Sequence, residues 1–331
     1  MAGSRKIGPF EVSAIGLGCM SLSHAYGTPP DAEASAALLN KALDLGYTFL
    51  DTAALYGFGA NETVIGNALK DRRGEYVLAS KCGMTGVDGK RVIDGRPETL
   101  KRTCDESLAR LQTDVIDLYY LHRWDKTVPI EDSVGALSEL VTAGKIKTIG
   151  LSETSSEAIG KAHAVHPIAA VQSEYSLWTR NPEYGVLETC KQLGIGFVAF
   201  GAIARGFLSG KLRDVEALPP RDIRRNMPRF QAPNFEANLA LLDGFARLAR
   251  EADCTMAQLA LAWVLARGDH IVPIPGTTSL AHLAENAAAA DVALSADVMA
   301  RLETLINPDT VHGPRYNAAT QAEIDTEEAP A

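Results

Sequence analysis

The 331-residue sequence lacks the features that mark several special classes of protein. Its five cysteines are scattered, odd in number and without a CxxC pair, which favours neither a zinc site nor a disulfide framework. No apolar run approaches the roughly 18 residues of a membrane span, and the opening MAGSRKIGPF contains no apolar signal segment. We therefore expect reduced thiols, no metal site and a soluble, cytoplasmic protein with no membrane partner.

The sequence also lacks an excess of basic charge. Lys and Arg number 32 against 41 Asp and Glu, which gives a formal net charge of −9. With no basic cluster to offset it, this balance argues against a nucleic-acid partner. Hydrophobic content of 46% and charged content of 22% are typical of a globular protein with a sizeable core. The expected partners are small molecules or protein, and the expected state is a monomer or weak homo-oligomer.

Short apolar runs alternate with helical patterns along the chain. The runs are nearly all apolar, which is typical of parallel strands buried on both faces. They span residues 14–17, 48–51, 77–81, 116–121, 148–152, 170–172, 196–200 and 270–274. The helical patterns between them span residues 32–45, 61–70, 97–111, 130–143, 155–164, 184–193 and 280–289.

Eight βα units without a dividing linker predict a single α/β domain over residues 1–331, a closed (β/α)8 TIM barrel. A doubly wound parallel sheet is the alternative on pattern alone. Residues 6–12 predict an N-terminal hairpin that plugs the barrel's bottom, and the long polar segment 201–234 predicts a functional lid. Extra helices are predicted at 235–251 and 256–267, before the eighth strand, and a disordered tail at about 318–331.

Polar or ionisable residues end four of the otherwise apolar strands. In chain order they are Asp51, Lys81, His122 and Ser152, and Tyr56 follows in the loop beyond the first. Each has an ordinary structural explanation, such as a loop cap, a solvated amine or a core histidine. In a barrel, however, the loops at the strands' C-terminal ends form the active site. Together these residues predict a site at the barrel mouth.

The residue types indicate a particular chemistry. A tyrosine with a pKa near 10 is a poor acid at neutral pH. We expect the ammonium of Lys81 to lower the pKa of Tyr56, and the carboxylate of Asp51 to hold the lysine in place. His122 is expected to bond the same substrate oxygen. This set predicts a tuned general acid above a carbonyl oxygen that gains charge when hydride reaches the carbon.

Asp51, Tyr56, Lys81 and His122 resemble, in order and on matching strands, the catalytic tetrad of the aldo-keto reductases. The resemblance runs from about residue 7 to 310 and is greatest to the bacterial branch. The segments that resemble successive family motifs are GLGCM, LDTAALYGFGANE, GKIKTIGLSE, VQSEYSLW, RGFLSGK and PIPGTTS. The resemblance implies an NAD(P)H-dependent oxidoreductase that reversibly reduces an aldehyde or ketone to the alcohol. It implies a hydride from nicotinamide and a proton from Tyr56.

The resemblance also implies a cofactor that lies extended across the barrel top. Ser152 and Gln172 would bond the carboxamide, Phe200 would stack on the nicotinamide, and Arg205 would supply charge to the pyrophosphate. The implied cofactor-binding set is Cys19, Met20, Asp51, Ser152, Glu153, Gln172, Phe200, Gly201, Ile203, Arg205, Gly206, Lys211, Ile274, Gly276, Thr277, Thr278, Ser279, His282, Glu285 and Asn286, the last two holding adenine.

Two positions depart from the family pattern. Glu153 stands where the family usually has Asn, and Thr278 and Ser279 stand where NADPH-using relatives often carry arginine. Hydroxyls and N–H groups at a helix N-terminus can hold a phosphate, so NADPH is the expected cofactor. NADH stays as the alternative, because a bidentate cationic partner is absent from these positions.

The substrate-binding residues are predicted to be Tyr56, His122, Trp124, Trp178 and Tyr316, with Met20 and the loop 86–92 as further walls. Aromatic walls favour a bulky or planar substrate. Two other functions stay open. One is a cofactor-binding regulatory subunit that resembles channel β-subunits, which share this fold. The other is a lyase or aldolase with Lys81 as a Schiff base, which needs a lysine free of a paired carboxylate.

Overall fold

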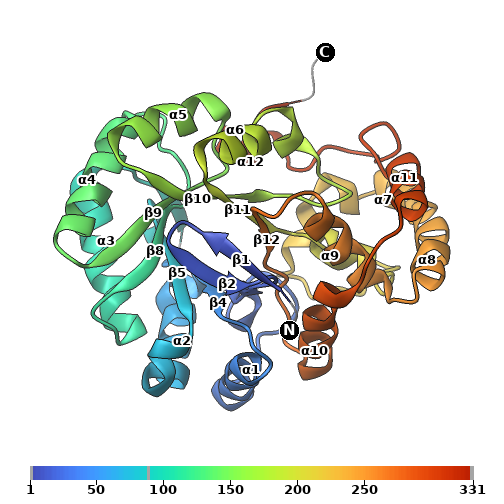
Figure 1. Ribbon diagram of the computed structural model, residues 1–331, viewed down its shortest axis with the longest axis horizontal. Coiled ribbons are helices and arrows are strands. Elements are labelled where there is room, and N and C mark those ends of the chain that lie inside the picture. The colour runs from blue at the N-terminus through green and yellow to red at the C-terminus, as the bar shows by residue number, and fades with distance from the viewer. Residues whose placement is uncertain (1–2, 88–89, 329–331) are drawn as a thin grey trace.

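The computed structural model describes residues 3–87 and 90–328, and a sheet of eight parallel strands lies at its centre. The strands of this sheet are β3 (Leu17–Gly18), β4 (Phe49–Asp51), β5 (Val77–Cys82), β8 (Ile116–Leu121), β9 (Ile146–Ser152), β10 (Ile168–Glu174), β11 (Gly196–Phe200) and β12 (Ile271–Pro273). They follow one another around the sheet in this order (Figure 1).

The two edges of the sheet meet. The amide of Gly16 donates to the carbonyl of Pro273 at 3.0 Å, and Gly18 pairs with Gly276 in a parallel bridge. Glycine is required at residue 18, because a Cβ there would lie 2.7 Å from the carbonyl oxygen of Ile274. The sheet is therefore the predicted closed (β/α)8 barrel, and not the doubly wound alternative.

Helices cover the outside of the barrel (Figure 1). Local signals start several of them: Asp31 and Ser155 cap two helices through their side chains, Pro97 opens a third, and Thr255 forms a capping box with Gln258. The helices that follow the strands are α1 (Ala32–Asp44), α2 (Ala60–Leu69), α3 (Pro97–Leu111), α4 (Ile130–Thr142), α5 (Ser156–Val165), α6 (Val186–Leu193) and α10 (Leu280–Ala288).

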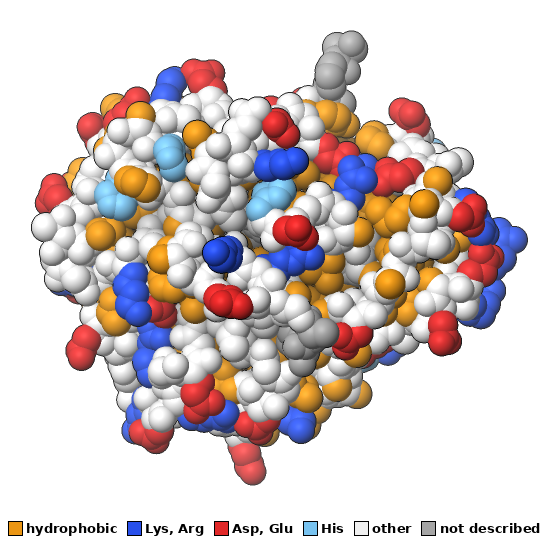
Figure 2. Space-filling model, viewed as in Figure 1, with side chains coloured by type: hydrophobic (Ala, Val, Ile, Leu, Met, Phe, Trp, Pro, Cys, Tyr) orange, Lys and Arg blue, Asp and Glu red, His pale blue; other side chains and the backbone are white. Residues whose placement is uncertain are grey.

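The predicted N-terminal hairpin is present as β1 (Ser4–Ile7) and β2 (Phe10–Ser13), which pair antiparallel. It crosses the near end of the barrel in Figure 1. Ile7 is fully buried against the apolar cluster inside the barrel, which includes Phe49, Leu118 and Val198. Figure 2 shows this same face, where acidic and basic side chains are interspersed. The hairpin therefore closes the bottom and leaves the opposite end for the site.

Two segments differ in detail from the prediction. The helix expected over residues 235–251 is two helices, α7 (Asn234–Leu239) and α8 (Leu241–Glu251). Ala240 between them keeps helical angles (φ −61°, ψ −25°), so the apolar period runs across the break and resembles one helix. The loop predicted at 86–92 belongs to a hairpin of β6 (Met84–Val87) and β7 (Lys90–Ile93), and its residues 88 and 89 lie outside the described residues. The predicted helix before the eighth strand is present as α9 (Met256–Ala266).

The C-terminal segment is more ordered than its polar composition predicts. α11 (Ala296–Leu305) precedes the predicted tail of about residues 318–331, and the short α12 (Ala318–Gln321) lies within it. Beyond them, the carboxylate of Asp325 accepts from the Ser155 hydroxyl at 2.6 Å, and that of Glu327 accepts from the Ser156 amide at 2.7 Å. Acidic side chains are favourable at the N-terminus of a helix, here α5. These contacts hold a segment predicted as disordered; residues 329–331 lie outside the described residues.

Candidate active site

A buried ion pair forms the floor of the site. Asp51 ends β4 and Lys81 lies in β5, and both side chains are inaccessible to solvent. The Lys81 ammonium donates to the Asp51 carboxylate and, at 2.7 Å, to the carbonyl of Thr52. Gln172 of β10 donates to the second Asp51 oxygen at 2.7 Å. Because Lys81 is paired, it does not meet the requirement for a Schiff-base lysine, and the lyase or aldolase alternative loses its basis.

Tyr56 and His122 lie directly above this pair. Lys81 Nζ donates to the Tyr56 hydroxyl at 3.4 Å. The rings of Tyr56 and His122 meet edge to face, with centroids 5.8 Å apart and an interplanar angle of 82°. Nδ1 of His122 is buried and has no hydrogen-bond partner within the described chain. The four residues of the predicted tetrad, Asp51, Tyr56, Lys81 and His122, are thus brought together.

The protonation states differ in one respect from the sequence argument. Burial raises the pKa of Tyr56 above its ordinary value, and the Lys81 ammonium only partly offsets this effect. The prediction that the pKa of Tyr56 is lowered was therefore wrong. Desolvation of the phenolate raises this pKa by more than the charge of Lys81 lowers it. Burial, followed by the charges of Arg123 and Lys81, holds the pKa of His122 well below its usual range. At neutral pH the site contains a protonated phenol and a neutral imidazole.

These groups open into a pocket of about 1150 Å³ at the end of the barrel opposite the hairpin. Its volume exceeds the roughly 300–1,000 Å³ common for small-ligand pockets, so it has room for an extended ligand and a second molecule. Most of the predicted residues line it: Met20, Asp51, Tyr56, His122, Ser152, Gln172, Phe200, Gly201, Ile203, Arg205, Gly206, Lys211, Ile274, Gly276, Thr277, Thr278, His282, Glu285, Asn286 and Tyr316.

The remaining predicted residues lie outside this lining in the part of the chain that the structure describes. Trp178 is buried and stacks on Phe207, with ring centroids 4.1 Å apart, so it packs within the core instead of lining the pocket. Trp124 donates its indole N–H to the carbonyl of Val128 at 2.9 Å and packs at the rim. The others are the buried Cys19, the floor lysine Lys81, Glu153 and the helix cap Ser279.

Glu153 is an ion-pair partner of the C-terminal segment. Its carboxylate accepts from Arg315 and, through Oε1, from the amide of Glu174 at 2.8 Å. Its side chain is fully buried, and that of Arg315 is 6% exposed. The sequence predicted a contact between Glu153 and the cofactor, but within the described residues this carboxylate is turned away from the pocket lining and neutralised.

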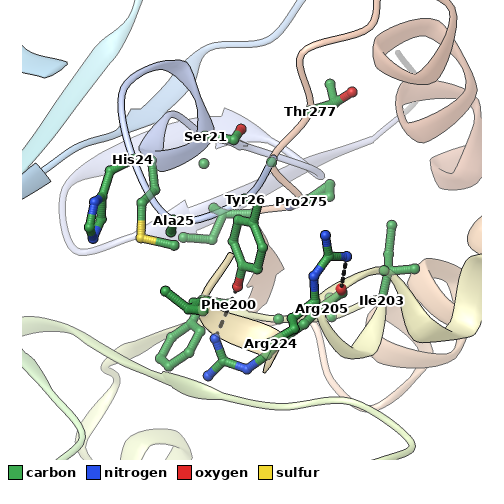
Figure 3. A pocket seen from close by; sticks show the side chains of 18 of the residues that line it. Ser21, His24, Ala25, Tyr26, Phe200, Ile203, Arg205, Arg224, Pro275 and Thr277 are labelled. Carbon is green, nitrogen blue, oxygen red and sulfur yellow. Dashed lines mark hydrogen bonds between the residues drawn. The ribbon is translucent and has the colours of Figure 1, made fainter. Parts of the chain in front are cut away.

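Arg205 is also neutralised within the protein. It forms an ion pair with Glu174 and donates to the hydroxyls of Tyr26 and Tyr316 at 3.0 and 2.9 Å. Figure 3 shows Tyr26 pointing across the pocket toward this group, beside Arg224, which bonds the Arg205 carbonyl at 3.1 Å. The insertion after β11 therefore meets the loop after β3 above the pocket. Tyr26 and Arg224 were not predicted as site residues, because neither stands in a motif that indicates a ligand.

One cationic contact appears only in three dimensions. Lys211 Nζ lies 2.8 Å from Nε2 of His282, and both residues line the pocket beside Thr277 and Thr278. Lys211 belongs to the insertion, whereas the others belong to the loop after β12 and to α10. A lysine ammonium therefore lines the same pocket as the threonines that stand in place of an arginine after PGT.

A closed eight-stranded barrel that holds a Tyr–His pair above a buried Lys–Asp pair defines a barrel oxidoreductase. The sequence model of the Aldo/keto reductase family matches residues 14–307 of this chain. The chain belongs to the aldo/keto reductase family. The predicted reaction class, carbonyl reduction with a nicotinamide cofactor, is confirmed at that level.

Solved structures resemble this chain over nearly its whole length. The glycerol dehydrogenase AKR11B4 from Gluconobacter oxydans is 29% identical, with a TM-score of 0.85 over 95% of this chain and 99% of its own. The aldo-keto reductase AKR11C1 from Bacillus halodurans, in its holo form, is 29% identical with a TM-score of 0.77 over 93% and 97%. An aldo/keto reductase from Klebsiella pneumoniae in complex with NADP and acetate is 29% identical with a TM-score of 0.71 over 95% and 99%.

Proposed function

We propose that this protein reduces an aldehyde or ketone to the alcohol with NADPH, and that Tyr56 is the proton donor. The observation that carries the proposal is the convergence of Tyr56, His122 and the Lys81–Asp51 pair at one end of a large pocket. The dehydrogenases and reductases among the similar structures support it, and nothing in them favours a regulatory channel subunit.

The pocket residues fit an extended dinucleotide. A bound nicotinamide supplies the hydride for the reaction. The amide oxygen of Gln172 and the hydroxyl of Ser152 would hold its carboxamide, and Phe200 offers a ring face to it. Gly201 and Gly206, with φ values of 65° and 89°, line the pocket and would let the backbone approach the pyrophosphate. Glu285 and Asn286 also line the pocket and would hold the adenine.

Each group near the reacting carbonyl has one task. Tyr56 is protonated at neutral pH, burial raises its pKa further, and it donates a proton to the oxygen as charge develops there. Neutral His122, held beside it, bonds and orients the same oxygen. Lys81 stabilises the phenolate that is left, and Asp51 holds the lysine. Tyr316 forms a further wall for the substrate.

Lys211 and its neighbours support the choice of NADPH over NADH. The ammonium of Lys211 contacts His282, and both residues line the same pocket as Thr277 and Thr278. A charge-assisted contact of this kind favours a ribose phosphate over a hydroxyl. The Klebsiella pneumoniae neighbours crystallised with NADP and with NADPH agree with this choice.

Location and assembly remain predictions. We expect a cytoplasmic protein that is a monomer or a weak homo-oligomer and takes a small carbonyl or alcohol substrate. Among the described helices, none combines the length and apolar character of a bilayer span.

The test follows the absorbance of NADPH while a panel of aldehydes and ketones is added to the purified protein. We expect oxidation of NADPH with at least one member, and alcohol formation in equal amount. Tyr56→Phe keeps the ring packing but removes the acid, so its turnover should fall at least about 100-fold while NADPH still binds. A Phe variant with more than about half of the wild-type turnover would refute the proton-donor assignment.

A further inference from the structure

Four arginines line the pocket, and three of them are neutralised by carboxylates. Arg205 pairs with Glu174, Arg224 with Asp222 and Arg91 with Glu323. The fourth, Arg123, follows His122 directly in the sequence. Within residues 3–87 and 90–328, no carboxylate lies within ion-pair distance of Arg123.

Arg123 is fixed in place by the backbone and side chain of neighbouring strand ends. Its Nη1 donates to the carbonyl of His122 at 2.7 Å and to the Ser152 hydroxyl at 3.2 Å. Both bonds use the same nitrogen, so Nε and Nη2 have no acceptor among the described residues. Arg123 is partly buried at the pocket wall, and a guanidinium with unused donors and no counterion there is suited to bind an anionic ligand.

The carboxylates near this end of the pocket are already paired with cationic side chains. The carboxylate of Asp51 is neutralised by Lys81, and that of Glu323 by Arg91. The other nearby walls, Leu55 and Met84, are apolar. Among residues 3–87 and 90–328, the region between Tyr56 and Arg123 therefore carries net positive charge and no unpaired carboxylate. Such a cleft attracts negative ligands.

We propose that Arg123 binds a carboxylate of the substrate, so that the preferred substrate class is an aldehyde or ketone that carries a carboxylate near its carbonyl. The two unused donors suit the planar, two-oxygen geometry of a carboxylate. Because Arg123 adjoins His122, a carboxylate bound there places the carbonyl of the same molecule beside the Tyr56 hydroxyl. This inference rests on the proposed carbonyl reduction and identifies the substrate class of that same pocket.

The test compares benzoylformate with its methyl ester, which differ in charge but share the reacting ketone. Both are assayed with NADPH on the wild type, on Arg123→Met and on Arg123→Lys. Arg96→Met is the control, because Arg96 is an exposed arginine paired with Asp94 outside the pocket lining. The readout is the ratio of kcat/KM for the acid to that for the ester, together with the Kd of NADPH for each variant.

We expect the wild type to prefer the acid. Arg123→Met should lower the acid-to-ester ratio at least about 10-fold, mainly through KM, as the loss of charge-assisted hydrogen bonds implies. Arg123→Lys should keep part of the preference, and Arg96→Met should keep all of it. A wild-type preference for the ester would overturn the inference. So would an equal loss of kcat/KM on both substrates in Arg123→Met with weakened NADPH binding, because Arg123 would then serve to position Ser152.

Calorimetric titration of benzoylformate into the protein with NADP separates this inference from the proposed function. Binding of the acid that Arg123→Met removes, without turnover of either ketone, would support the carboxylate site and count against carbonyl reduction. Turnover of the ester without binding of the acid would support carbonyl reduction and refute the carboxylate site.

Discussion

Replacing Glu153 by Gln tests whether the tail is held over the barrel by a buried ion pair. The substitution keeps the size of the side chain and an oxygen for the amide of Glu174, and removes only the negative charge. Arg315, whose side chain is 6% exposed, then loses its main counterion. Loss of one partner of a buried pair costs about 3–5 kcal/mol. The lower end applies here, because Glu174 stays 3.4 Å from Arg315 Nε.

The expected change in melting temperature follows from the size of the chain. Unfolding entropy of about 2.1 cal/mol/K per residue gives about 0.7 kcal/mol/K for 331 residues. A loss of about 3 kcal/mol therefore lowers Tm by about 4 °C. The assay is differential scanning calorimetry at one fixed pH and scan rate. Glu157→Gln, which breaks an exposed pair with Lys161, is the matched control and should leave Tm unchanged within about 1 °C.

The double variant Glu153→Gln with Arg315→Met distinguishes an ion pair from a merely local contact. Removing both charges should recover at least half of the lost Tm, since an apolar replacement of a buried pair is often neutral. Recovery is expected to be incomplete, because the Arg315 guanidinium also lies 4.5 Å from the Tyr316 ring centroid. An unchanged Tm for Glu153→Gln, or additive losses in the double variant, would refute the reasoning.

Three further predictions concern the site itself. Burial raises the pKa of Tyr56, and reduction needs the protonated phenol, so the rate of reduction should stay level between about pH 6 and 9 and decline above about pH 10. The rate of alcohol oxidation, which needs the phenolate, should rise above about pH 10. A decline of the reduction rate near pH 7 would count against Tyr56 as the proton donor. Lys81→Met should lower turnover about 100-fold and move the decline of reduction at alkaline pH to a higher pH. Asp51→Asn should lower turnover less, because the lysine keeps its bond to the carbonyl of Thr52. A larger loss for Asp51→Asn than for Lys81→Met, with both variants folded, would contradict these roles. Lys211→Met should weaken NADPH binding about 10-fold and leave NADH binding unchanged, as measured by quenching of tryptophan fluorescence, with the exposed Arg221→Met as control; equal weakening for both cofactors would place Lys211 away from the phosphate.

The secondary structure and the order of the βα units could be predicted from the sequence. Strands buried on both faces leave continuous apolar runs, and helix-start residues such as Pro97 leave local signals, so the order of the βα units and most boundaries could be predicted. The strand ends also identified Asp51, Lys81 and His122, because a barrel delivers the ends of all its strands to one mouth. These inferences needed only local pattern and one topological rule.

Contacts between distant segments were decided by the tertiary structure. The pairs Glu153–Arg315 and Lys211–His282 join residues 162 and 71 positions apart, and no local pattern records such distances. Glu153 adopts φ 56°, a region that Asn tolerates better than Glu, and its buried ion pair offers a physical reason for the departure from the family residue.

The net shift of the Tyr56 pKa shows the same limit. The sequence correctly indicated that Lys81 favours the phenolate, but burial opposes the lysine and depends on every segment that covers the pocket. Desolvation is a property of the folded surface rather than of neighbouring residues in the chain. The sequence therefore determined which groups meet, and only the tertiary structure decided how strongly each is buried and paired.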